Sequence, residues 1–113
     1  MIDRATFTGM YENFDKEVVV EIIDIFINEY NDRIATLQAN ITDNNTDSLY
    51  KNAHSIKGVI ANFYDDEARD LAYKLEQKGK NGDMSGITEI FVNFKTASRN
   101  LLNELTELKE SYL

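Results

Sequence analysis

The chain has 113 residues, the length of one domain, and 42% of them are hydrophobic, enough to bury a single core. Twelve lysines and arginines stand against 20 aspartates and glutamates. The resulting net charge of −8 disfavours binding to nucleic acid or to an anionic membrane surface. Because proline and cysteine are both absent, a turn-rich β fold is disfavoured, and disulfides, thiolate metal sites and a catalytic thiol are excluded.

The first dozen residues carry acidic side chains where a secretory signal has a basic segment followed by an apolar one. No window of the chain reaches about 18 uninterrupted apolar residues. We therefore expect a cytoplasmic monomer that does not associate with membranes. The same segment is expected to form a short helix or turn over one end of a helical bundle, because it holds five apolar side chains: Ile2, Phe7, Met10, Tyr11 and Phe14.

Residues 17–41 show the clearest helical pattern, with apolar side chains three and four positions apart: Val19, Ile22, Ile23, Phe26, Ile27, Tyr30, Ile34, Leu37 and Ile41. The polar segment TDNNTD follows and is typical of a loop, since its side chains compete for backbone hydrogen bonds. Thr46 or Asp47 is the predicted N-cap of a second helix, which is expected to end near Tyr64 and Asp65.

A third helix is predicted from Asp66 to about Lys78, with Asp65, Asp66 and Glu67 capping it and complementing its dipole. The segment KGKNGDMSG, with three glycines, is expected to end it. Asp83 or Ser85 can cap a last helix, whose apolar residues recur in heptad steps as far as Leu108. Four helices with short loops predict an all-α, antiparallel up-down four-helix bundle, a single domain over residues 1–113.

His54 is the only histidine, and at about 100° per residue it lies roughly 140° from Leu49, outside the apolar stripe of its helix. Lys57 and Gly58 follow on the same flank. A glycine inside a helix costs about 1 kcal/mol relative to alanine, so Gly58 indicates close approach by another backbone, such as that of a docking partner.

Glu76 is expected to face His54, because both lie eleven residues from Asp65, the centre of the turn between the two helices. A carboxylate there can accept the Nδ1 proton and leave Nε2 unprotonated and nucleophilic. The alternative is that His54 is an ordinary surface residue. A metal site is not indicated, since one histidine with scattered carboxylates has no ligand spacing.

The run Ala53-His54-Ser55-Ile56-Lys57-Gly58, continued by VIANF and followed by Leu71 and Leu75-Glu76, resembles the signature of the histidine phosphotransfer (HPt) domain of multistep phosphorelays. The resemblance covers nearly the whole chain. It departs from the family pattern at Tyr64 and Asp65, in the turn between the central helices, where many members have glycine and a small apolar residue.

The resemblance implies a four-helix bundle in which His54 takes a phosphoryl group from the aspartyl phosphate of a receiver domain and passes it to another. The implied partners are response-regulator receivers and a hybrid sensor histidine kinase. On this interpretation Lys57 stabilises phosphoryl charge, Glu76 orients the imidazole, and the chain needs no cofactor because the receiver supplies Mg²⁺. The docking surface is expected to include Gly58, with Tyr50, Ile60 and Ala61 at its edge.

Two other functions remain open at the level of sequence. The chain could be a helical adaptor that performs no chemistry. It could also be the N-terminal phosphoacceptor domain of a larger histidine kinase of the chemotaxis type, with ATP as the donor. No nucleotide-binding motif supports an enzyme that acts alone.

Overall fold

The computed structural model describes residues 1–113 and contains helices but no strands. This confirms the all-helical prediction. The elements are α1 (Arg4–Tyr11), α2 (Lys16–Thr42), α3 (Thr46–Ile60), the 3₁₀ turn η1 (Ala61–Phe63), α4 (Asp66–Lys80), α5 (Ile87–Lys109) and a final 3₁₀ turn η2 (Glu110–Tyr112). None of the helices combines the length and the apolar character needed to span a membrane.

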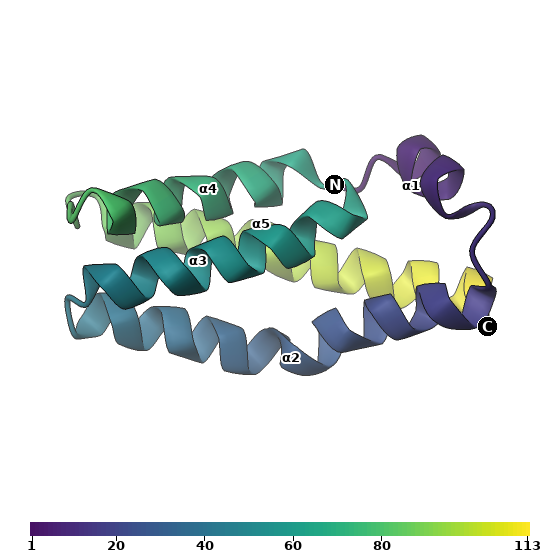
Figure 1. The fold of residues 1–113 in the computed structure, drawn as a ribbon, viewed down its shortest axis with the longest axis horizontal. Helices are drawn as coiled ribbons and strands as arrows, with labels where there is room; N and C mark the ends of the chain where they lie inside the picture. The colour runs from purple at the N-terminus through teal and green to yellow at the C-terminus, as the bar shows by residue number, and fades with distance from the viewer.

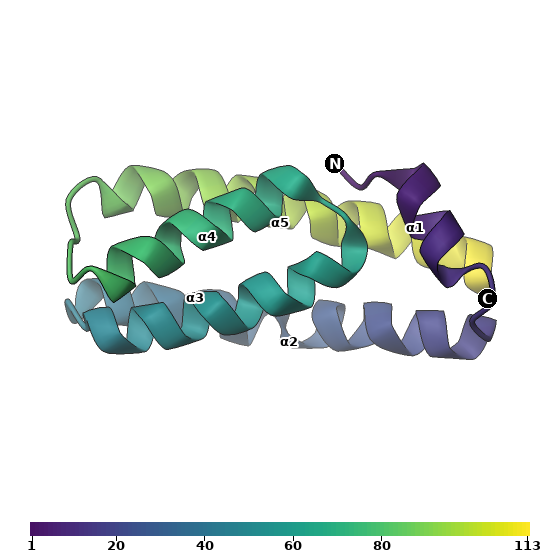
Figure 2. The same cartoon turned by 45° about the horizontal axis from the view of Figure 1, so that its top comes forward.

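The four long helices lie side by side along the long axis of the molecule, and the chain reverses direction at each connection between them (Figures 1 and 2). α3 packs against α2 and α4, and α5 packs against the same two helices. α1 lies at the end of the molecule where α5 ends (Figure 1). Its Phe7 and Tyr11 are buried, and the Tyr11 hydroxyl donates a hydrogen bond to the carbonyl of Asn62, which fixes α1 to η1.

The core consists of the apolar stripes that the sequence periodicity predicted. Four phenylalanines from α2, η1 and α5 are at most 3% exposed in this core: Phe26, Phe63, Phe91 and Phe94. Ser98 lies in the stripe of α5 and is also buried, with its hydroxyl 2.7 Å from the Tyr30 hydroxyl. The core therefore contains one satisfied polar pair, as burial of a hydroxyl requires.

Two predicted helix starts are wrong. α3 is capped by Asn45, whose side chain accepts from the backbone N–H of Ser48, so the cap precedes the predicted Thr46 or Asp47. Neither Asp83 nor Ser85 caps α5. The Asp83 carboxylate accepts from the backbone N–H and the hydroxyl of Ser85 in a local turn. The N-cap position is occupied by Gly86, with φ 68°, and α5 starts at Ile87.

The ends of the two central helices also differ from the prediction. α3 ends at Ile60, continues as η1, and turns at Tyr64, which adopts a left-handed φ of 58°. Asp65 then caps α4 by accepting from the N–H of Ala68, as predicted. α4 runs on to Lys80, so Gly79, expected in the segment that ends the helix, lies inside it.

Candidate functional site

His54 projects from the middle of α3, and its side chain is 66% exposed. Its ring makes one hydrogen bond, between Nδ1 and Oε2 of Glu76 on α4, at 3.1 Å. The structure therefore brings together the two residues that the hairpin register paired. Because Nδ1 is engaged by a carboxylate, that atom carries the proton and Nε2 keeps its lone pair. Nε2 makes no hydrogen bond within the chain.

Glu76 is 5% exposed, which is unusual for a carboxylate, and it is held by two donors. Lys57 Nζ lies 2.8 Å from Oε2 and 3.1 Å from Oε1, and His54 is the second donor. Burial by itself would raise the pKa of Glu76. The hydrogen bonds and charges of Lys57 and His54 outweigh burial and lower the pKa below its usual 4.5. Glu76 is thus a buried anion at neutral pH.

Lys57 lies one turn along α3 from His54 and faces the same carboxylate. Its side chain is only 25% exposed, and its Nζ also lies 5.1 Å from the centre of the Tyr73 ring, a cation–π distance. The sequence did not predict a role for Tyr73. The available signal is its position three residues before Glu76, which places both on one face of α4.

Gly58 and Ala61 are exposed on the strip that continues from His54 toward the end of α3. A Cβ built on Gly58 would meet no atom within 4 Å, so no backbone of this chain explains the glycine. A hollow of about 440 Å³ adjoins the strip and is lined by Lys57, Gly58, Ala61, Arg69, Asp70 and Tyr73. This hollow therefore begins at Lys57 and Gly58, about one helical turn from His54.

The other two residues predicted at the edge of the docking surface differ in burial. Tyr50 is half-buried, and its ring centre lies 6.4 Å from that of His54. Ile60 is fully buried, so its assignment to the docking surface is wrong. The physical reason is its position in the apolar stripe of α3, in step with Leu49, Ala53 and Ile56, which are also buried.

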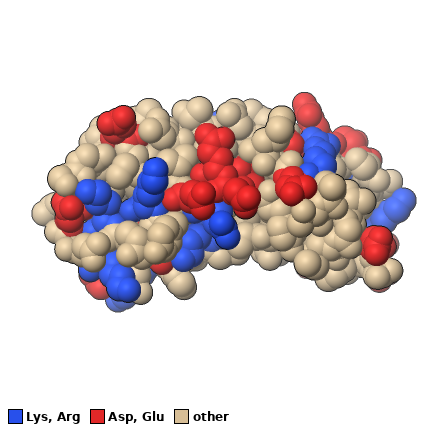
Figure 3. All heavy atoms as spheres, turned by 90° about the horizontal axis from the view of Figure 1, so that it is seen from above, with Lys and Arg blue, Asp and Glu red and all other residues tan.

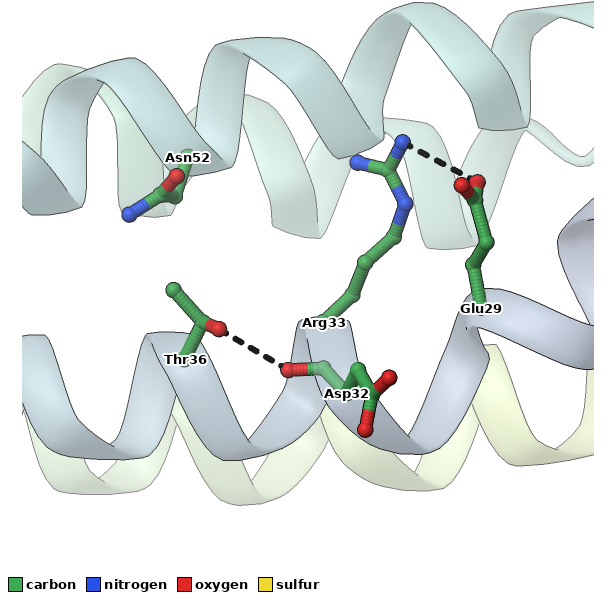
Figure 4. A pocket seen from close by; sticks show the side chains of 5 residues that line it. All are labelled: Glu29, Asp32, Arg33, Thr36 and Asn52. Carbon is green, nitrogen blue, oxygen red and sulfur yellow. Dashed lines mark hydrogen bonds and ion pairs between the residues drawn. The ribbon is translucent and has the colours of Figure 1, made fainter.

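A separate polar hollow of about 220 Å³ lies between α2 and α3 and is lined by Glu29, Asp32, Arg33, Thr36 and Asn52 (Figure 4). Arg33 donates to Glu29 and to the hydroxyl of Ser55, the residue after His54. Neither His54 nor any other predicted site residue lines this hollow. Glu29 and Arg33 are paired with each other, whereas Asp32 takes part only through its backbone carbonyl, which accepts from the hydroxyl of Thr36.

Charge on the face seen from above is divided: basic side chains gather toward one end and acidic ones across the middle (Figure 3). α4 follows the same order, with Asp66 and Glu67 in its first turn and Lys78 and Lys80 in its last. This distribution complements the helix dipole. Nowhere in the chain do three or more His, Asp or Glu side chains form a group that could hold a metal ion.

Comparison with known proteins identifies the family. A family model described as "Hpt domain" matches residues 21–111. The structure is similar to that of histidine-containing phosphotransfer protein B from Pseudomonas aeruginosa PAO1, with a TM-score of 0.88 and 18% identity, covering 99% of this chain and 96% of the other. No curated protein sequence matches closely enough to count as a relative. Because the family model spans most of the chain, this protein belongs to the Hpt domain family and serves histidine phosphotransfer in a phosphorelay.

Proposed function

We propose that His54 is the phosphoacceptor, and that it carries a phosphoryl group between aspartyl-phosphate receiver domains. The observation that carries the proposal is the hydrogen bond of Nδ1 to Glu76, which leaves Nε2 as a nucleophile on an exposed side chain. No other imidazole occurs in the sequence. Receiver domains and histidine kinases are the kinds of partner with which Hpt proteins work.

In the transfer step, the Nε2 lone pair attacks phosphorus in line with the bond to the aspartyl oxygen of the receiver. The new P–N bond forms as the P–O bond breaks, and the aspartate leaves as a carboxylate. The transition state is loose, so alignment and charge stabilisation contribute most of the rate. Since Nδ1 stays protonated, the phosphorylated ring is cationic, and the buried Glu76 carboxylate stabilises that charge.

Lys57 has three N–H donors, and the two oxygens of Glu76 occupy two of them. The third is available to a phosphoryl oxygen on the neighbouring ring. Lys57 thereby serves two anions: it holds Glu76 in place and offers charge to the transferred group. This dual role modifies the sequence-based expectation of a lysine that acts on the phosphoryl group alone.

The remaining parts of the active site are proposed to come from the receiver. This chain presents no cluster of carboxylates beside His54, so we infer that it needs no cofactor of its own and that the receiver binds Mg²⁺. Docking is proposed on the exposed strip with Gly58 and Ala61, with Tyr50 at its edge. We further propose that residues 1–113 act as one monomeric, antiparallel four-helix domain in the cytoplasm, with a hybrid sensor kinase upstream.

Incubation with a phosphorylated receiver tests the assignment. Wild type is expected to become an acid-labile, base-stable phosphoprotein, and His54→Gln is expected to take up no label. Because His54 lies outside the core, the variant is expected to keep the melting temperature of wild type. Label retained by His54→Gln would contradict the proposal. A parallel incubation with ATP and no receiver separates a phosphocarrier, which stays unlabelled, from a chain with kinase activity of its own.

A further inference from the structure

Gly79 on α4 packs directly against the backbone of α3. A Cβ built on it would lie 2.5 Å from the backbone N of Tyr50, 2.8 Å from the carbonyl O of Thr46 and 2.9 Å from the Cα of Tyr50. All three obstacles are backbone atoms in the first turns of α3 and cannot rotate away as a flexible side chain could. Gly79 is buried, and α4 continues through it to Lys80. Only a residue without a side chain allows the helices this separation.

This contact lies one turn from the functional site on both helices. On α3, Tyr50 is four residues before His54; on α4, Gly79 is three residues after Glu76. At a rise of about 1.5 Å per residue, the contact is only about 4.5–6 Å along the helix axes from the His54–Glu76 hydrogen bond. The separation of the helices at Gly79 therefore controls the separation of their backbones at His54 and Glu76.

The other glycine near the site does not have this property. A Cβ on Gly58 would meet nothing within 4 Å, although Gly58 also lies inside a helix. Helix ending does not explain Gly79 either, because its φ is not in the left-handed region and the turn after α4 is made at Gly82, with φ 63°. Close packing against the backbone of α3 therefore explains why position 79 is a glycine.

We propose that Gly79 is a positioning residue: it sets the α3–α4 separation at which the Glu76 carboxylate, held on α4, reaches Nδ1 of His54 on α3. A side chain at this position moves the helices apart next to a hydrogen bond that is already 3.1 Å long. Glu76 then either loses contact with the imidazole or leaves its buried place beside Lys57. The expected loss of transfer rate rests on the proposed role of His54 as phosphoacceptor. The expected change in the tautomer of the His54 ring does not depend on that role.

The test is ¹⁵N NMR of the His54 ring, which reports directly which nitrogen carries the proton. Three variants are compared with wild type: Gly79→Ala, Glu76→Ala as the reference for a lost contact, and Leu105→Ala as a control that destabilises the core elsewhere. Leu105 is fully buried on α5. Gly79→Ala is expected to move the tautomer ratio most of the way to that of Glu76→Ala, and Leu105→Ala is expected to leave it at the wild-type value.

If Gly79→Ala alone fails to fold, the same spectra are recorded on Gly9→Ala/Gly79→Ala. Gly9 is exposed in α1 with open space around its Cα, so alanine there raises helix propensity without a new contact. A double variant that still fails to fold while Leu105→Ala folds would contradict a positioning role and make Gly79 purely a folding requirement. Gly9→Ala alone is expected to match wild type in both spectrum and transfer rate.

Transfer from a phosphorylated receiver is measured on the same proteins, and Gly79→Ala is expected to be on the order of 10-fold slower, within the range for loss of an orienting partner. A folded Gly79→Ala with the wild-type tautomer ratio would overturn the proposal, as would an equal change in Leu105→Ala. A changed ratio in Gly79→Ala, found together with a wild type that itself takes no label on His54, would instead support the role of Gly79 and refute the proposed phosphoacceptor.

Discussion

The exposed surface of α3 and its buried interface with α4 each contain a glycine, but the two glycines have different surroundings. The outer strip, with His54, Gly58 and Ala61, is exposed and leaves room for another molecule. The inner seam against α4, with Glu76 and Gly79, is buried and leaves no room for a methyl group. A Cβ on Gly58, in the strip, would meet no atom within 4 Å, whereas a Cβ on Gly79, in the seam, would clash with the backbone of α3. We infer that the strip presents the nucleophile and the seam fixes its orientation.

Ile60 and Ala61, adjacent residues where α3 continues into η1, give the largest expected contrast between the buried core and the exposed strip. Ile60 is fully buried and Ala61 is exposed. Ile60→Ala is expected to lower the free energy of unfolding by about 2–5 kcal/mol, because it leaves a cavity, while the folded fraction transfers at the wild-type rate. Ala61→Gln is expected to change stability by less than about 0.5 kcal/mol and to slow transfer. Urea unfolding measures the stability of both variants, and receiver-to-His54 transfer measures their activity. A reversed pattern would mean that the core and the strip are misassigned.

The contribution of the seam to chemistry is tested by Glu76→Ala. Loss of the carboxylate removes the partner of Nδ1 and the charge that stabilises a phosphorylated ring, so transfer is expected to slow by about 10–100-fold without being abolished. Single-turnover labelling gives the rate, with Glu76→Gln as the matched control for shape without charge. Transfer at the wild-type rate in Glu76→Ala would show that Glu76 is only a structural anion for Lys57.

The sequence predicted which residues face each other better than it predicted how closely two helices pack. Helical periodicity was enough to place His54 on the flank of its helix, and counting outward from Asp65 was enough to pair it with Glu76, because a short antiparallel hairpin fixes register to about one turn. Periodicity also indicated that Ile60 belongs to the core stripe; its assignment to the docking surface ignored that signal.

The distance between two helices was not predictable in the same way. Gly79 lies among glycines that are typical of a helix end, and nothing in the local sequence shows that α4 continues through it and packs on the backbone of Tyr50. The helix starts failed for a related reason. Several neighbouring Asn, Asp, Ser and Thr residues can each cap, and local bonds such as Asp83 to Ser85 decide which one does.

Side chains of increasing size at Gly58 test whether this part of the strip contacts the receiver. Gly58→Ala is expected to stabilise the free domain by up to about 1 kcal/mol, because a methyl group meets nothing and helix propensity rises. Gly58→Gln is expected to remain folded and to transfer more slowly, since the longer side chain enters the space proposed for the receiver. Thermal unfolding and labelling check the pair. Normal transfer by Gly58→Gln would exclude this part of the strip from docking.

The smallest expected effect is the pH dependence of the stability that the ionised Glu76 carboxylate contributes. The pKa of Glu76 is lowered in the folded protein, so the ionised carboxylate stabilises the fold fully above its unfolded pKa of about 4.5 and loses this effect as pH falls through the lowered pKa. Unfolding of wild type and Glu76→Gln between about pH 6 and about pH 3 is the measurement. The stability difference is expected to shrink toward low pH; a constant difference would show that the charge of Glu76 is not involved.

The position of the phosphoryl group on the imidazole tests the central claim most directly. That claim is that Nδ1 is held by Glu76 while Nε2 accepts the phosphoryl group. Glu76 engages Nδ1 from the buried side, and Nε2 is left for the partner. The account predicts that ³¹P and ¹⁵N NMR of the phosphorylated protein show phosphorus bonded to Nε2, with Nδ1 still protonated. A phosphoryl group bonded to Nδ1 would contradict it, since the Glu76 contact would then have to break before transfer.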